Sequence, residues 1–263
     1  MNFNRIPVTR RLCRGAITMA LLLAVSVPQT VLAQDDPRTF PDTGFSVTDD
    51  AVWSFFSQYG GAGTFGEPIS REFLLMDTPV QLFQNAALEI QPDGSIQPMQ
   101  LTDPGILPYT SLNGLTAPSA NPATAFVAPT PDQSNYMARL QVYIAAIVNE
   151  PFLSTYTTSG GPAVWGLPTS TAIADPNNPN FSYQRFQNGI LFYDATAGTT
   201  QPLPLGTYLK DVLTAQNLPA DLASEAASSP LLAQYAPSQS NGLARPGQLT
   251  QTNLTDAFAP DAV

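Results

Sequence analysis

The sequence predicts an α+β fold made of two helix-turn-β-hairpin units with connecting helices. Three observations predict it. The phrase GGAGTFGEPIS at 60–70 recurs as GGPAVWGLPTS at 160–170, with the same spacing of glycine, proline and serine. Apolar residues at helical spacing precede both phrases, and segments rich in β-forming residues follow both. The chain therefore contains an internal repeat of about 50 residues, seen twice.

The first residues have the composition of an export signal. Four arginines precede an apolar run at 16–27, and the segment ends at Val31-Leu32-Ala33, which fits a small-residue cleavage site. The run is shorter than the roughly 20 residues needed to span a bilayer. We expect residues 1–33 to be a signal peptide that leaves no membrane span after cleavage, so the mature chain is secreted or on the cell surface. Sec and twin-arginine export both stay open.

Charge and composition exclude several classes of function. Cleavage would remove four of the ten basic residues and none of the twenty acidic ones, which takes the formal charge from −10 to −14. Such an acidic protein repels nucleic acid and anionic lipid. Cleavage would also remove Cys13, the lone cysteine, so we expect no disulfide and no thiolate-bound metal.

The sequence contains no histidine. This excludes serine-histidine-aspartate and cysteine-histidine sites and histidine-bound zinc. No cofactor and no metal are predicted, and no calcium-loop motif is present. Carboxylate pairs, or a serine-lysine pair using Lys210, are the remaining catalytic alternatives.

Each unit is expected to begin with a short helix that ends at a pair of glycines. Unit 1, at 40–103, carries Val52 and Phe56 on its helix, and unit 2, at 152–205, carries an equivalent apolar pair. A glycine after a helix supplies the left-handed conformation that closes it. We therefore expect at least one positive φ angle in Gly60-Gly61 and one in Gly160-Gly161.

A rigid turn follows each glycine pair. Gly66-x-Pro68 and Gly166-x-Pro168 fix the exit of the chain, because proline sets its own φ and biases its predecessor toward extended geometry. A phosphate-binding glycine loop is the alternative. It would require a lysine with serine or threonine, or a helix start, directly after the glycines, and neither phrase has one.

A strand pair is predicted after each turn. In unit 1, Leu82–Ile90 is rich in β-formers and Asp93-Gly94 signals a hairpin turn. In unit 2 the strands flank residues 196–198. Phe83 and Phe186 are expected to be equivalent core residues, with the neighbouring glutamine and asparagine amides bonded to turn backbone.

The remaining segments connect or follow the units. Residues 104–131 read as a proline-rich linker or irregular loop, and 132–151 as a connecting helix with one apolar stripe ended by a proline. Short helices are expected at 206–235 and a disordered tail at 236–263.

Two segments of unit 2, WGLPTS at 165–170 and FQNGILFY at 186–193, resemble the LGFP repeat of secreted and cell-surface bacterial proteins. Unit 1 departs more, with Ala86 where the family has glycine and Glu89 where an aromatic is usual. Its opening, FPDTGFSV at 40–47, is similar to repeat units that have histidine in place of Phe45. The resemblance implies an accessory module that attaches to the envelope and has no catalytic residues.

Three classes of function follow from these observations. The first is a module that binds cell-wall or exopolysaccharide glycan, since sugars are held by aromatic faces and fixed polar groups. Residues that the units do not share are free to bind a ligand, so the candidates are Trp53, Tyr59, Arg185, Phe192 and Asp194. A structural or protein-interaction component of the envelope is the second class. The third is a two-carboxylate glycosidase, for which Glu67, Glu72, Glu89 and Asp194 would be the acids.

Overall fold

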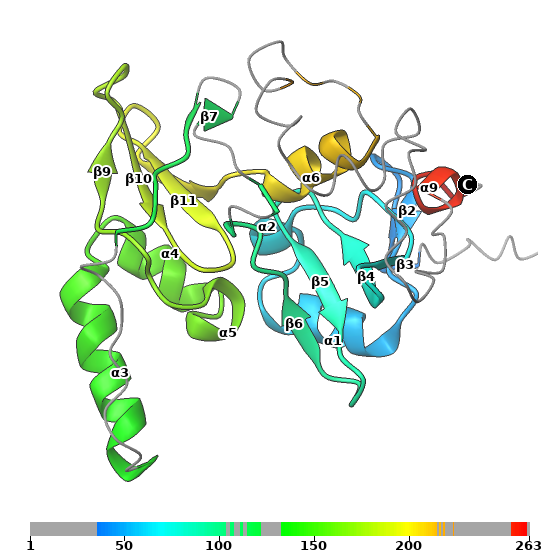
Figure 1. The fold of residues 1–263 in the computed structure, drawn as a ribbon, viewed down its shortest axis with the longest axis horizontal. Helices are drawn as coiled ribbons and strands as arrows, with labels where there is room; N and C mark the ends of the chain where they lie inside the picture. The colour runs from blue at the N-terminus through cyan, green and yellow to red at the C-terminus, as the bar shows by residue number, and fades with distance from the viewer. Residues whose placement is uncertain are drawn as a thin grey trace, which may run out of the picture. The chain divides into compact units, whose positions relative to one another are not determined.

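The computed structural model describes residues 36–103, 106–107, 111–112, 115–121, 133–214, 216, 218, 223 and 254–261. In this part of the chain helices and antiparallel sheets are mixed, as an α+β fold requires (Figure 1). The expected signal peptide lies outside the described residues. Among the described helices, none is both long enough and apolar enough to cross a membrane.

Unit 1 consists of two short helices followed by an antiparallel sheet. A two-residue strand pair, β1 (Thr39–Phe40) with β2 (Phe45–Ser46), leads into α1 (Asp50–Gln58) and α2 (Ala62–Phe65). The sheet has the order β3-β4-β5-β6, formed by Phe73–Leu75, Thr78–Leu82, Ala87–Ile90 and Ile96–Pro98. The Asp49 carboxylate begins α1 by accepting hydrogen bonds from the backbone amides of Ala51 and Val52.

Unit 2 has the same order of elements. Helices α4 (Phe152–Thr158) and α5 (Pro162–Trp165) precede a sheet with the order β9-β10-β11-β12. Its strands are Ile173–Ala174, Phe181–Arg185, Ile190–Asp194 and Thr199–Pro202. The apolar pairs on the first helix of each unit are buried, as expected.

The glycine pairs take the predicted conformation. The φ angles are 99° and 56° at Gly60 and Gly61, and 105° and 52° at Gly160 and Gly161. In each unit the amide of the second glycine donates back to the helix, Gly61 to the Phe56 carbonyl and Gly161 to the Tyr156 carbonyl. The prediction that each pair ends a helix in the left-handed conformation is confirmed.

The strand predictions need a correction. Residues 82–90 do not form one strand: β4 ends at Leu82 and β5 begins at Ala87, and Phe83 donates to the Ala86 carbonyl within the turn. Each sheet therefore has four strands where a hairpin was expected. The hairpin turn at Asp93-Gly94 is correct, since Gly94 has a φ angle of 80° between β5 and β6.

The amides beside the core phenylalanines bond to turn backbone, as predicted. The Gln84 carboxamide accepts from the Glu67 amide at 3.0 Å, and Gln187 accepts from Leu167 at 2.8 Å. The asparagine that follows each glutamine donates to a helix-end carbonyl, at Thr64 in unit 1 and Val164 in unit 2. These bonds satisfy polar groups that burial would otherwise leave unpaired.

Phe83 and Phe186 are both fully buried in one aromatic cluster. The cluster also holds Phe65 and Trp165, which were predicted to be core residues, and draws side chains from both units. A second, mainly aliphatic cluster also contains residues of both sheets, among them Leu82 and Ile190. The cores of the two units are therefore continuous through shared clusters.

The segment that leaves each sheet bonds to the turn of the other unit. Thr102, after β6, donates from its hydroxyl to the carbonyls of Phe186 and Gln187, at 2.9 and 2.7 Å. Thr207, in helix α6 (Leu205–Thr214), donates its backbone amide to the Gln84 carbonyl at 3.0 Å. We call these the exit-segment contacts.

The expected linker is partly built into the fold. Within 104–131, the strands β7 (Ser111–Leu112) and β8 (Leu115–Thr116) pair, and Leu107 and Ala117 are buried in the aliphatic cluster. The connecting helix α3 covers Gln133–Ile147, and its Leu140 and Ile144 are buried as the apolar stripe predicted.

The prediction of a disordered tail is wrong for residues 254–261. Helix α9 (Leu254–Ala257) buries Ala257 in the aliphatic cluster, and Phe258 packs against the same cluster. Of the short helices expected at 206–235, the structure shows α6, which ends at Thr214. Residues 236–253 and most of 215–235 lie outside the described residues.

Unit 2 carries a longer loop between its first two strands, which a carboxylate organises. Asp175 accepts hydrogen bonds from the Tyr183 hydroxyl at 2.8 Å, the Thr116 hydroxyl at 3.0 Å, and the backbone amides of Asn177 and Asn178. Burial acts to raise the pKa of Asp175, but these bonds outweigh it and bring the pKa below its ordinary value of 3.8.

Ionisation of Asp175 makes the free energy of unfolding depend on pH. Because the pKa of Asp175 is lower in the folded chain, its ionised form stabilises the fold above pH 3.8, and this contribution is lost as the pH falls through the folded-state value. We expect Asp175→Asn to lose less free energy of unfolding than wild type between about pH 7 and about pH 2.5. Urea titrations at both pH values measure this, and equal losses in the two proteins would contradict it.

Candidate functional site

Trp53 lies half-buried on α1 with polar side chains beside it. Its ring stacks on Phe56 with centroids 5.6 Å apart, and the Arg38 guanidinium lies 5.6 Å from the indole centroid. An arginine at this distance from an indole interacts with the ring quadrupole. The tryptophan is therefore fixed both by the core and by a surface cation.

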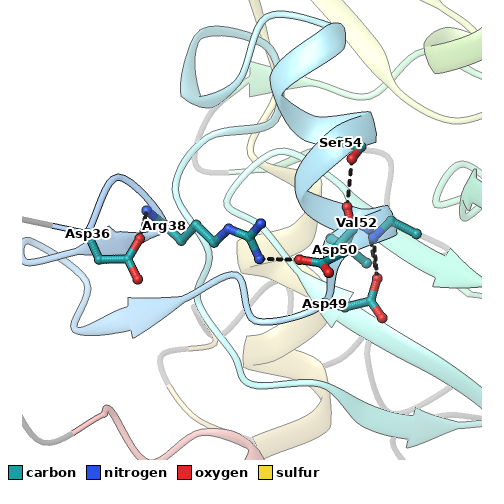
Figure 2. A network of polar contacts seen from close by, with 7 residues as sticks. Asp36, Arg38, Asp49, Asp50, Val52 and Ser54 are labelled. Carbon is teal, nitrogen blue, oxygen red and sulfur yellow. Dashed lines mark hydrogen bonds and ion pairs between the residues drawn. The ribbon is translucent and has the colours of Figure 1, made fainter.

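Arg38 is itself held in place by two carboxylates (Figure 2). Its Nη1 donates to Asp50 Oδ1 at 2.6 Å, and its backbone amide donates to Asp36 Oδ1 at 2.9 Å. The Asp50 side chain is 89% exposed. An ion pair this exposed adds only about 0–1 kcal/mol to stability. The exposed Asp50 carboxylate faces solvent, where a ligand could reach it. We call Arg38, Asp50 and Trp53 the Trp53 patch.

Tyr59 has a structural role between the units. Its ring packs on Phe55 with centroids 4.7 Å apart, and a Cβ atom on Gly160 would lie 2.7 Å from Tyr59 Cδ1. Gly160 thus leaves room for the tyrosine as well as adopting a positive φ. Tyr59 belongs to the contact between the units rather than to an open binding face.

Arg185, which was predicted to contact a ligand, is only 9% exposed and lies inside the fold. Its guanidinium donates to the backbone carbonyls of Pro118 and Thr102. Desolvation lowers the pKa of Arg185, against the effect of Asp103, which raises it. The adjoining cavity, lined by Arg185 and Leu101 among others, measures about 10 Å³, which is too small for a sugar ring.

Phe192 and Asp194 lie on the same face of β11, but both have local partners. Phe192 packs edge-on against Phe181 with centroids 6.1 Å apart. The Asp194 carboxylate accepts from the amides of Thr196 and Ala197 and so forms the hairpin turn. This face of the strand therefore offers the partly exposed ring of Phe192 and an acceptor, Asp194, that already accepts two backbone hydrogen bonds.

The other candidate acids, Glu67, Glu72 and Glu89, lie on separate segments of unit 1. Glu67 follows the Gly66 turn of unit 1, and Glu89 lies on β5, where desolvation raises its pKa against a hydrogen bond from Gln91. The pKa of Glu72 is raised by burial and by Asp49, but Asp49 is already the N-cap of α1. Among the described residues no three histidine, cysteine, aspartate or glutamate side chains gather as metal ligands.

Lys210 is likewise engaged by structure. Its Nζ donates to the Ile69 carbonyl at 2.8 Å, and burial lowers its pKa, with Asp211 acting in the opposite direction. The neighbouring Ser70 hydroxyl accepts from the Leu82 amide. Lys210 and Ser70, which follows Ile69 in the chain, therefore both have backbone partners.

The five predicted ligand residues are not brought together. Trp53 and Tyr59 pack beside the aromatic cluster, Phe192 packs beside the aliphatic cluster, and Arg185 is inside the fold. Sequence reasoning missed Arg38 and Asp50, since Arg38 precedes the strand pair and reaches α1 only through the fold. The sequence signal at Asp50 was its place in the first turn of a helix, where acidic residues are common.

The chain was compared with protein-family models, with curated proteins and with solved structures, and none of them matches.

Proposed function

We propose that this chain is an exported, non-catalytic module of two divergent LGFP-like repeats, and that it binds cell-envelope glycan through the Trp53 patch. The observation that carries the proposal is a half-buried indole held beside an oriented guanidinium-carboxylate pair whose Asp50 side chain is 89% exposed. Carbohydrate sites need this combination, because C–H groups pack on an aromatic face while hydroxyls require fixed donors and acceptors.

The two-repeat architecture is supported by matching contacts at matching positions. Gln81 donates to the carbonyls of Ser46 and Ser70, and Gln184 donates to those of Ile147 and Ser170. A bridge joins Pro68 to Phe83 and another joins Pro168 to Phe186. Bonds that recur in both units belong to the scaffold, and the scaffold is what the LGFP resemblance covers.

Trp53 is not part of that shared scaffold. The equivalent position in unit 2 is Leu153, which also packs beside the aromatic cluster but offers no flat ring. A binding face can be kept in one copy and lost from the other, while core positions must be kept in both. The acidic chain, with a formal charge of −10, favours a neutral glycan over an anionic one.

Replacing Trp53 by leucine, the residue of unit 2, tests the patch. The change keeps an apolar side chain against Phe56 and removes the stacking surface. We expect affinity for the bound cell-wall or exopolysaccharide fraction to fall about three- to tenfold, since aromatic stacking is worth about 0.5–1.5 kcal/mol beyond its area. Pull-down isotherms with purified glycan fractions measure the loss.

Two controls make the test specific. Arg38→Ala breaks an exposed ion pair, so it is expected to weaken binding with little change in thermal stability. Leu153→Ala, at the equivalent position of unit 2, is expected to leave binding unchanged. If wild type has no affinity for any envelope glycan fraction, the alternative of a structural or protein-interaction component replaces the glycan-binding proposal.

A further inference from the structure

The C-terminal segment docks on one edge of unit 1. The Arg71 amide donates to the Ala257 carbonyl at 2.8 Å, and the Asp261 amide donates to the Gly44 carbonyl at 2.7 Å. The Arg71 guanidinium also donates from Nε to Asp261 Oδ1 at 2.8 Å and from Nη2 to the Pro260 carbonyl at 3.2 Å. Backbone bonds with a charge-assisted pair are the elements of peptide recognition.

An aromatic anchor completes the contact. The Phe258 ring meets Phe73 edge-on with centroids 5.6 Å apart, and Phe73 is 7% exposed. Lys210 Nζ lies 5.0 Å from the Phe258 ring centroid and 5.1 Å from that of Phe45. A cation between two rings favours an aromatic residue at this place in the docked segment.

The docking face also accommodates the backbone of the segment. Gly44 has a φ angle of 74°, and a Cβ atom there would lie 2.9 Å from Pro260 Cβ. We call the face formed by Gly44, Phe45, Arg71, Phe73 and Lys210 the tail dock. The corresponding edge of unit 2, residues 171–174, is exposed, and its Ile173 side chain is 39% exposed.

Most side chains of the docked segment remain partly or fully exposed. Among residues 254–261 only Ala257 is buried, and the side chains of Arg71 and Asp261 are 44% and 32% exposed. Segments with few buried apolar contacts open at a free energy below that of global unfolding. We therefore expect the segment to leave the dock at a lower free energy than unfolding of the sheets.

We propose that the tail dock is an exchangeable peptide-binding site, filled within one chain by residues 254–261 and able to take the same segment from a second copy of the chain. The chemistry that selects the ligand is an aromatic anchor for the Phe45-Lys210-Phe73 surface, followed by a carboxylate for Arg71. Exchange of an identical segment between copies is a low-cost route to association, because each new contact replaces the same contact within one chain. Covalent connection favours the contact within one chain over the same contact between two copies.

Two complementary full-length variants test this proposal. The acceptor, Phe258→Ala/Asp261→Asn, has an open dock and a disabled segment, whereas the donor, Arg71→Ala, has an intact segment and a weakened dock. We expect sedimentation velocity to show a 1:1 complex when the two are mixed, beyond any species that each forms alone. Adding Arg71→Ala to the acceptor is expected to weaken the complex at least about tenfold, since a charge-assisted bond is lost. Thr171→Ala, at the matching position of unit 2, serves as the control and leaves the complex intact.

The proposal is overturned if the folded donor and acceptor form no new complex. It is also overturned if adding Arg71→Ala to the acceptor leaves the affinity of the complex unchanged. Near-UV circular dichroism of each variant establishes that it is folded. If a variant is not folded, hydrogen exchange of wild type decides: the amides of Arg71 and Asp261 are expected to exchange well before the Phe83 amide in the core turn. Exchange of all three at one rate would mean that the segment is a fixed part of the fold, and the proposal would fail.

Discussion

Alanine at Phe83 or at Phe186 is expected to lower the free energy of unfolding by about 3–5 kcal/mol. Both side chains are fully buried. Phe83 stacks on Phe56 with centroids 5.2 Å apart, and Phe186 stacks on Tyr156 at 4.9 Å. Each truncation removes an aromatic ring from the cluster shared by both units and leaves a cavity that neighbouring rings fill only in part.

Urea unfolding of the two variants measures this loss. Ile173→Ala is the matched control, because Ile173 is 39% exposed and its truncation is expected to change stability by less than about 0.5 kcal/mol. A loss below about 1 kcal/mol at both phenylalanines would show that these positions are not core positions, contrary to their place in the aromatic cluster.

Gly206→Ala is expected to cost about 3 kcal/mol, although helix propensity alone predicts a gain of about 1 kcal/mol at a position inside α6. A Cβ atom at Gly206 would overlap the Phe83 carbonyl oxygen and would stand 2.7 Å from that of Ala86. Both contacts are with backbone, which cannot rotate away as a side chain can. A loss of unfolding free energy in Gly206→Ala therefore indicates steric contact, and a gain indicates that helix propensity dominates.

Gly63→Ala in α2 is the matched control for that substitution. A Cβ atom at Gly63 would meet nothing within 4 Å, so alanine there is expected to be neutral or to stabilise by up to about 1 kcal/mol. Thermal and urea unfolding of both variants give the comparison. A stabilising Gly206→Ala would mean that α6 does not press against the turn of unit 1.

The features that the sequence predicted best are those governed by local rules. A glycine pair after an apolar helix face predicts a left-handed helix end, and all four glycines have positive φ angles. Comparing the two units predicted burial of Phe83 and Phe186 without reference to another protein. A residue that is kept in both units is expected to build their common core. Both side chains are buried.

The features that sequence reasoning missed depend on contacts between distant segments. The outer strands β3 and β9 are three and two residues long, too short to show an alternating pattern, and they exist because a neighbouring strand pairs with them. The tail was predicted to be disordered from composition, but Ala257 and Asp261 find their partners near residues 44 and 71. Composition does not report such partners.

Arg185 shows how the comparison of units could have been used further. Its equivalent in unit 1 is Leu82, which is fully buried on β4. A position that is core in one unit predicts burial in the other, even where the residue is charged. The guanidinium is accommodated because the carbonyls of Thr102 and Pro118 accept its hydrogen bonds. At Trp53 the two units also agree in burial, because Trp53 and its equivalent Leu153 are both partly buried beside the aromatic cluster.

The exit-segment contacts limit how a protein of this design can be lengthened or shortened. The carbonyls of Gln84 in unit 1 and of Phe186 and Gln187 in unit 2 receive their donors from the segment that leaves the other unit. Deleting one unit would remove the donors of the survivor together with half of its aromatic cluster. Inserting a third unit between them would require every exit segment to find a new acceptor. The pair, rather than the single repeat, is therefore the smallest part of this chain that recombination could move intact.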